Sequence, residues 1–239
     1  MKSILVPTDF SKCAANAMNC AVHLARETGA EVIALHIVYP NEGVDNNMYN
    51  VFWSDQYMNE REKGLKTWIH KFRREKENKD IRFKADCRVG FPVPGICDAA
   101  AETGVDLIVM GTTGATGLRG AFLGSVAAGV MTRTQTPVLS IPKNASWLNS
   151  GNAVLATDFK LKLDNRSLTV LRALLHLKES NLNIVHILDK PGVEPDKARE
   201  ETVRQKLDNL PHNFHYLHDR DIAQFSGSDK GRPARCRCA

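Results

Sequence analysis

The chain has 239 residues, of which 43% are hydrophobic and 25% are charged, and its formal net charge at pH 7 is +5. These values are ordinary for a soluble globular protein with one large domain or two small ones. No apolar stretch approaches the ~20 residues of a membrane span, and Pro7 interrupts the short N-terminal run Ile4–Val6 too early for a signal peptide. We therefore expect a cytoplasmic protein without a membrane partner.

The positive charge is uneven, because residues 226–239 hold four cations against the single carboxylate of Asp229. A nucleic-acid surface needs a basic face on a folded element. We interpret the run Lys71–Lys79 as a solvated helix end, and we do not expect nucleic acid as a partner.

The six cysteines form no C-x-x-C pair and no zinc-like spacing with histidine, which indicates small buried side chains in a reducing compartment.

The first elements are a strand, a helix and a second strand. Ser3–Val6 is a short apolar strand, and polar residues follow it at Pro7–Ser11. Small apolar residues at three- and four-residue spacing predict a helix over Lys12–Thr28, ended by Gly29. The continuous apolar run in Glu31–Val38 predicts a strand buried on both faces, which is typical of a parallel sheet.

Helices and strands continue to alternate after a loop at residues 40–49. We predict a turn at Gly90–Pro94 and, in chain order, a helix at Ser54–Lys76, a strand at 81–89, a helix at Gly95–Thr103, a strand at Leu107–Met110, a helix at Val126–Thr134 and a strand at Val138–Ile141. This alternation predicts an α/β fold, an open parallel five-stranded sheet with helices on both faces.

A glycine-spaced loop, Gly111–Ser125, joins the fourth strand to the following helix. Glycines let backbone N–H groups approach an anion, and a helix N-terminus adds unpaired donors and a partial positive charge. The loop therefore predicts a phosphate site. A flexible linker without a ligand is the alternative interpretation.

The sequence repeats after residue 151. Thr8-Asp9-Phe10 returns as Thr157-Asp158-Phe159, and Leu35-His36-Ile37 returns as Val185-His186-Ile187. The chain is thus a tandem duplication of one unit, with a complete copy at residues 1–143 and a partial copy at residues 152–219 that lacks the glycine loop. Residues 220–239 have no apolar period and are interpreted as a disordered tail or an aberrant end.

The first copy resembles the universal stress protein family in its tandem two-domain form. Gly111-x2-Gly114-x9-Gly124-Ser125 is similar to the family's nucleotide signature, and Pro7-Thr8-Asp9 fits its opening. The resemblance implies strand order 3-2-1-4-5 and ATP, with or without Mg²⁺, across the first and fourth strands. The implied contacts to the base, ribose and phosphates are Pro7, Thr8, Asp9, Ile37, Met110, Gly111, Gly114, Gly124, Ser125 and Val126.

Three functions remain open. The first is an ATP-binding regulatory protein of the stress response with an unknown protein partner. The second is a slow ATP hydrolase or a phosphoryl or adenylyl transferase, although the loop holds no lysine and only Asp9 could serve as a nearby carboxylate. The third is a dimerisation module without nucleotide. We also expect a homodimer through the apolar edge strand Val138–Ile141, and no nucleotide in the partial copy.

Overall fold

The computed structural model describes residues 1–39, 55–112, 123–145, 152–159, 164–178, 180–188 and 196–218. Contacts divide the chain into two units. Unit 1 comprises Met1–Asn149 and Asn165–Leu177, and unit 2 comprises Ser150–Asp164 and Lys178–Ala239. Among the described helices, none is long and apolar enough to cross a bilayer.

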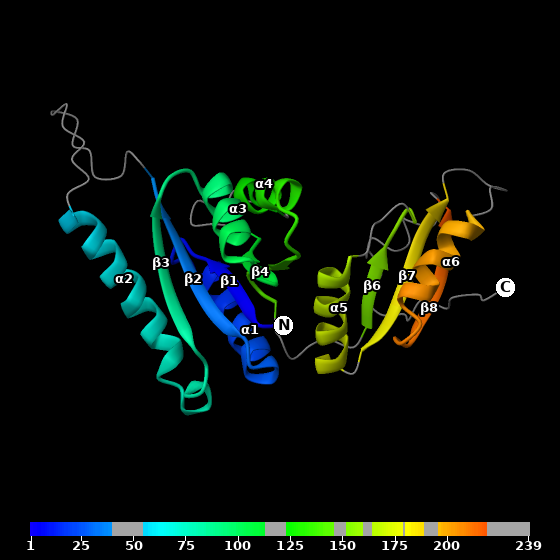
Figure 1. Cartoon of the computed structure of the whole chain (residues 1–239), viewed down its shortest axis with the longest axis horizontal. Helices are drawn as coiled ribbons and strands as arrows, with labels where there is room; N and C mark the ends of the chain where they lie inside the picture. The colour runs from blue at the N-terminus through cyan, green and yellow to red at the C-terminus, as the bar shows by residue number, and fades with distance from the viewer. Residues whose placement is uncertain are drawn as a thin grey trace. The chain divides into compact units, whose positions relative to one another are not determined.

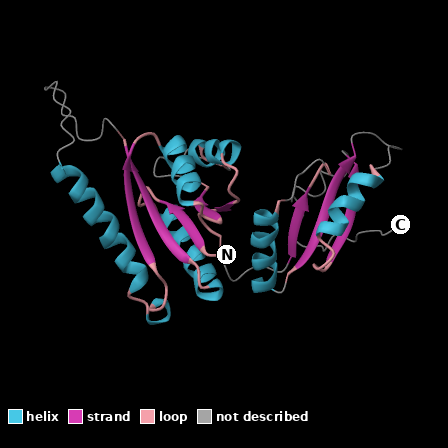
Figure 2. Ribbon diagram, in the orientation of Figure 1, coloured by secondary structure: helices cyan, strands magenta, loops and turns pink. Residues whose placement is uncertain are grey.

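Unit 1 is built on a five-stranded sheet of order β3-β2-β1-β4-β5 in which every pairing is parallel (Figures 1 and 2). This confirms the predicted fold class and strand order. The strands are β1 (Ser3–Pro7), β2 (Glu31–Val38), β3 (Phe83–Val89), β4 (Leu107–Gly111) and β5 (Val138–Ile141). The helices are α1 (Lys12–Thr28), α2 (Asp55–Arg73), the 3₁₀ turn η1 (Lys76–Asn78), α3 (Pro92–Thr103) and α4 (Ser125–Arg133).

Two hydrophobic cores cover the two faces of this sheet. Alternate residues of β1 and β2 point to opposite faces, so Ile4 and Val6 join one core and Leu5 joins the other. The first core receives the apolar faces of α1 and α2, and the second receives those of α3 and α4. Because both faces are covered, the central strands are apolar throughout, as the sequence predicted.

Helix α3 begins earlier than predicted. It starts at Pro92, with Phe91 as the N-cap, so the predicted turn Gly90–Pro94 is wrong beyond its first two residues. Proline suits the first helical turn because its missing N–H would be unpaired there in any case. Gly95, inside the helix, lies against β2: a Cβ on it would be 2.9 Å from the Ile37 Cδ1 atom.

Unit 2 contains a three-stranded parallel sheet of order β6-β7-β8. Its strands are β6 (Asn152–Ala156), β7 (Asn181–Leu188) and β8 (His212–His218), and α6 (Lys197–Lys206) connects β7 to β8. The order matches β1-β2-β3 of unit 1, so a partial second sheet follows the first. Helix α5 (Asn165–Lys178) places Val170 in the first hydrophobic core of unit 1.

Candidate functional site

The carboxyl ends of β1 and β4 lie side by side in the sheet. Ile4 pairs with Leu107 and Leu5 pairs with Ile108, so the segments after Pro7 and Gly111 leave the sheet at the same edge. The chain continues from β1 to β2 on one side, whereas β4 occupies the other side. Ligands of open α/β sheets bind at this kind of switch point.

The turn after β1 is held by three short-range hydrogen bonds. The Phe10 amide donates to Thr8 Oγ1 at 3.0 Å, and the Ser11 amide donates to Asp9 Oδ1 at 3.0 Å. Ser11 Oγ then caps α1 by accepting from the Ala14 amide at 3.2 Å. Thr8 is buried, whereas Asp9 is exposed at the sheet edge. The Asp9 carboxylate is therefore fixed in place and still faces solvent.

Phe10 has a φ of 62°, a left-handed conformation that costs a non-glycine residue energy. Its ring centroid lies 4.6 Å from that of His36 and 6.0 Å from that of Trp68. His36 Nδ1 lies 2.9 Å from the Thr8 carbonyl oxygen, and this pairing assigns the ring proton to Nδ1. The histidine thus holds the turn from β2.

Unit 2 repeats this arrangement. The Phe159 amide donates to Thr157 Oγ1 at 2.9 Å, and His186 Nδ1 lies 2.7 Å from the Thr157 carbonyl oxygen. Phe159 also has a positive φ, 58°, and its ring lies 4.4 Å from that of His186. The shared threonine, phenylalanine and histidine therefore build one turn twice, and unit 2 offers a matched control for experiments on unit 1.

Gly111 is required by a close approach between β4 and the first turn of α1. A Cβ at this position would lie 2.7 Å from Cys13 Sγ and 3.1 Å from the Cys13 backbone carbon. Cys13 is 4% exposed, and its Sγ donates to the Ile141 carbonyl oxygen at 3.4 Å. The base of the candidate site is thus a closely packed junction of β4, β5 and α1.

The described ends of the glycine loop meet beside this junction. The Thr112 amide donates to the Ile141 carbonyl oxygen at 3.0 Å, and the Gly124 amide donates to the Thr112 carbonyl oxygen at 2.5 Å. Since Gly124 is the N-cap of α4, the amides of Ser125 and Val126 fall in the first turn, where helices leave donors unpaired. Ser125 is exposed. Residues 113–122, and with them Gly114, lie outside the described residues.

The predicted residues therefore fall into three groups. Pro7, Thr8 and Asp9 lie at the end of β1, Met110 and Gly111 at the end of β4, and Gly124, Ser125 and Val126 at the start of α4. Ile37 lies on β2 beyond His36, and its side chain packs on the second core. The sequence did not indicate Phe10, His36 or Cys13 as supports of this edge, although the repeated Thr-Asp-Phe and histidine were a signal for the first two.

The edge suits an anion better than a bare metal ion. Among the described residues, no group of three or more His, Cys, Asp or Glu side chains could hold a metal ion. Backbone amides at the start of α4, next to the close contact of Gly111 with Cys13, are instead suited to phosphate oxygens. A carboxylate across the edge, at Asp9, could accept hydrogen bonds from hydroxyl groups.

Comparison with known proteins identifies relatives. The family model described as "Universal stress protein family" matches residues 1–142. Universal stress protein MJ0531 of Methanocaldococcus jannaschii is 34% identical over 144 residues, covering 59% of this chain and 82% of the relative. Universal stress protein MJ0577 of the same organism is 29% identical, covering 61% of this chain and 97% of the relative.

One solved structure shares the fold over most of the chain. It is a universal stress protein from Archaeoglobus fulgidus, with a TM-score of 0.63 and 18% identity, and the match covers 90% of this chain and 78% of the other. At this identity the likeness concerns the fold alone.

Proposed function

The chain belongs to the universal stress protein family, and from this premise we propose that unit 1 binds ATP and acts as a cytoplasmic, nucleotide-dependent regulatory protein of the stress response. The observation that carries the proposal is the meeting of two kinds of group at one sheet edge. The exposed Asp9 carboxylate follows β1, and the first-turn amides of α4 follow the loop after the adjacent strand β4. A ribose and a phosphate chain need donors and acceptors of these kinds.

Each part of the ligand has an assigned group in this proposal. Pro7, Thr8 and Asp9 contact the base and ribose, and the Ile37 backbone contacts the base. Gly114, Ser125 and Val126 donate to the phosphates. The Gly124 amide already donates to the Thr112 carbonyl, so Gly124 contributes by closing the loop. Three charge-assisted hydrogen bonds at ~1.5–3 kcal/mol each are compatible with micromolar affinity after association costs.

ATP hydrolysis is the second candidate, and its chemistry has little support at this edge. Fast phosphoryl transfer requires a positioned base and charge stabilisation of the γ-phosphate. Asp9 accepts from the Ser11 amide. His36 donates from Nδ1 to the Thr8 carbonyl, and its basic Nε2 atom is buried, so it does not face a ligand at the exposed edge. If Mg²⁺ accompanies ATP, the phosphate oxygens would be its main ligands. We therefore propose a switch, in which nucleotide changes the populations of surfaces offered to a protein partner.

Isothermal titration calorimetry with ATP, ADP and AMP tests this proposal. We expect one adenine nucleotide per chain, and we expect Gly114→Val combined with Ser125→Ala to abolish binding. Thr8→Ala should weaken binding, because the Phe10 amide loses its acceptor, whereas the matched Thr157→Ala in unit 2 should not. A wild-type chain without measurable affinity would leave only the dimerisation module. Rapid turnover of bound ATP would replace the switch by an enzyme.

A further inference from the structure

A group of cations lies near the amino ends of the strands, whereas the candidate site lies at their carboxyl ends. We call Lys71, Arg73, Arg74, Lys76, Lys79 and Arg82 the basic surface. All six are exposed, and in the described part of the chain none forms an ion pair with a carboxylate. They occupy the end of α2, η1 and the residues before β3. Because β3 starts here, the surface lies at the amino edge of the sheet (Figure 1).

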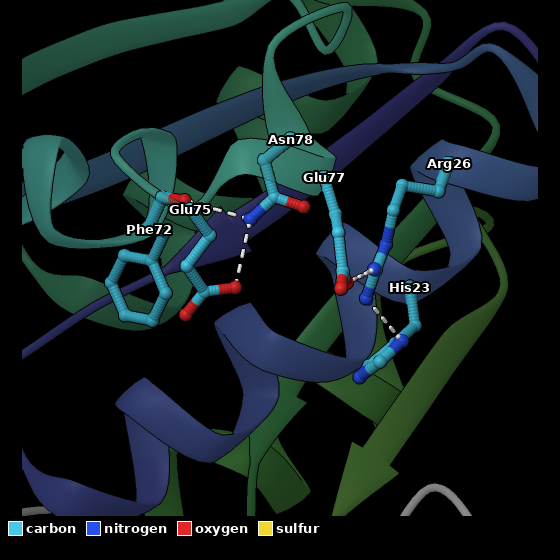
Figure 3. Close-up of polar contacts among 6 residues, drawn as sticks. All are labelled: His23, Arg26, Phe72, Glu75, Glu77 and Asn78. Atoms are coloured by element: carbon cyan, nitrogen blue, oxygen red, sulfur yellow. Dashed lines mark hydrogen bonds and ion pairs between the residues drawn. The ribbon is translucent and has the colours of Figure 1, made fainter.

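The turn that carries these cations is fixed by a buried asparagine. Asn78 is fully buried, and its Nδ2 donates to the Phe72 carbonyl oxygen at 2.7 Å and to Glu75 Oε2 at 3.1 Å (Figure 3). The Asn78 amide also donates to the Glu75 carbonyl at 3.0 Å, and the Ile81 amide donates to the Asn78 carbonyl at 3.2 Å. The end of α2 is therefore anchored, which lowers the entropy lost when its cations bind a partner.

The same contacts occupy two of the three carboxylates in this segment. Glu75 accepts from Asn78, and Glu77 is paired with Arg26 of α1 (Figure 3). Only Asp80 remains exposed without such a contact among the described residues. Residues 71–82 hold six lysines and arginines against three carboxylates. Glu75 and Glu77 are exposed like the cations, but each already has a partner, Asn78 and Arg26, so the segment keeps an excess of positive charge for a ligand.

The chemistry of this face indicates the class of partner. No large hydrophobic side chain of α2, η1 or the following residues to 84 is exposed among those described, since Trp68 and Phe72 are buried in the core. A protein interface normally needs an apolar centre with aromatic anchors. Single-stranded nucleic acid needs exposed aromatic rings on which bases stack. A surface of charge alone fits the regularly spaced phosphates of a duplex, which arginine can bind in a bidentate manner.

We propose that the basic surface binds the phosphate backbone of double-stranded nucleic acid without sequence preference. This reverses the expectation drawn from the sequence, in which Lys71–Lys79 was a solvated helix end. The structure adds what the sequence did not show, namely a turn fixed by Asn78 and six exposed cations that form no ion pair with a carboxylate among the described residues. Binding of the duplex at the basic surface does not depend on ATP binding, because the basic surface lies at the amino ends of the strands and the candidate site lies at their carboxyl ends.

Fluorescence anisotropy with a labelled 20-base-pair duplex, measured on the full chain from 50 to 200 mM salt, tests the proposal. We expect log K to fall linearly with log salt, with a slope of about −0.9 for each phosphate neutralised. Lys71→Gln, Arg74→Gln and Lys76→Gln together should lower the magnitude of this slope by about 2.7, because three contacts are lost. These side chains are exposed, so the thermal unfolding midpoint should stay unchanged.

The matched control neutralises three cations of the C-terminal segment, Arg232→Gln, Arg235→Gln and Arg237→Gln, and we expect it to leave the slope unchanged. The proposal is overturned if the chain does not bind the duplex at 50 mM salt. It is also overturned if the control variant, rather than the α2 variant, loses binding. Preferential binding to vesicles containing anionic lipid would assign the surface to a membrane instead.

Discussion

Replacing Gly111 by alanine tests whether the floor of the site is packed as described. The added Cβ would lie 2.7 Å from Cys13 Sγ and 3.1 Å from the Cys13 backbone carbon, whereas carbon atoms in contact prefer ~3.5–4.0 Å. Because one of these neighbours is backbone, the start of α1 must move away from β4. Overpacking of this kind costs about 1–3 kcal/mol, and the lower entropy of an unfolded alanine returns ~0.4–1 kcal/mol.

We therefore expect Gly111→Ala to lower the free energy of unfolding by about 1–2 kcal/mol. Urea denaturation measures this change, and nucleotide titration should show weaker binding because the β4 end and Asp9 are displaced relative to each other. Gly64 is the matched control: it lies inside α2, and a Cβ there would meet nothing within 4 Å. Gly64→Ala should stabilise the protein by ~0.5–1 kcal/mol.

A double-mutant cycle separates this clash from a general effect of alanine. Adding Cys13→Ala removes the nearest atom, Sγ, so Gly111→Ala should cost less in that background, with a coupling energy of at least ~0.5 kcal/mol. The reasoning is refuted if Gly111→Ala is as stable as the wild type, or if its cost is the same with and without Cys13.

Three further predictions follow from other contacts. His36→Ala removes the hydrogen bond to the Thr8 carbonyl, and the loss of ~1 kcal/mol should weaken ATP binding roughly fivefold. The matched His186→Ala should destabilise unit 2 without changing that affinity. Equal effects of the two variants on affinity would contradict the role of His36. Burial, and after it the charges of Glu62 and Asp86, raise the pKa of the Cys87 thiol in the folded protein. Less of the reactive thiolate therefore exists at pH 8, and mass-spectrometric mapping should show that iodoacetamide alkylates Cys87 more slowly in the folded protein than in the protein unfolded by guanidinium. Equal rates in the two states would contradict this. The edge strand Val138–Ile141 predicts a dimer in light scattering at tens of micromolar, and a monomer there would count against it.

The layers of unit 1 could be predicted because alternating helices and strands permit few arrangements. Continuous apolar strands require cover on both faces, and right-handed crossovers then give a parallel sheet. The start of α3 could not be predicted from composition, because Pro92, Pro94 and Gly95 together are typical of a turn. The structure tolerates them because the prolines fall in the first helical turn, where no N–H is needed, and Gly95 fits against Ile37.

At the candidate site, glycine spacing indicated the right junction but not the reasons for its residues. Gly111 is fixed by its distance to Cys13, a contact between residues almost a hundred positions apart. The positive φ of Phe10 and its support by His36 depend on the pairing of β1 with β2. Such contacts are set by the assembled sheet, so no local pattern could predict them from one copy, although their repetition at Phe159 and His186 could have drawn attention to them.

The central claim, that one adenine nucleotide occupies the edge between β1 and β4, is tested most directly by a crystal structure with a non-hydrolysable ATP analogue. We predict phosphate density at the Ser125 and Val126 amides, ribose density beside Asp9, and no nucleotide at Thr157-Asp158 in unit 2. Density for the analogue at another surface, or an empty edge at a saturating concentration, would contradict the account.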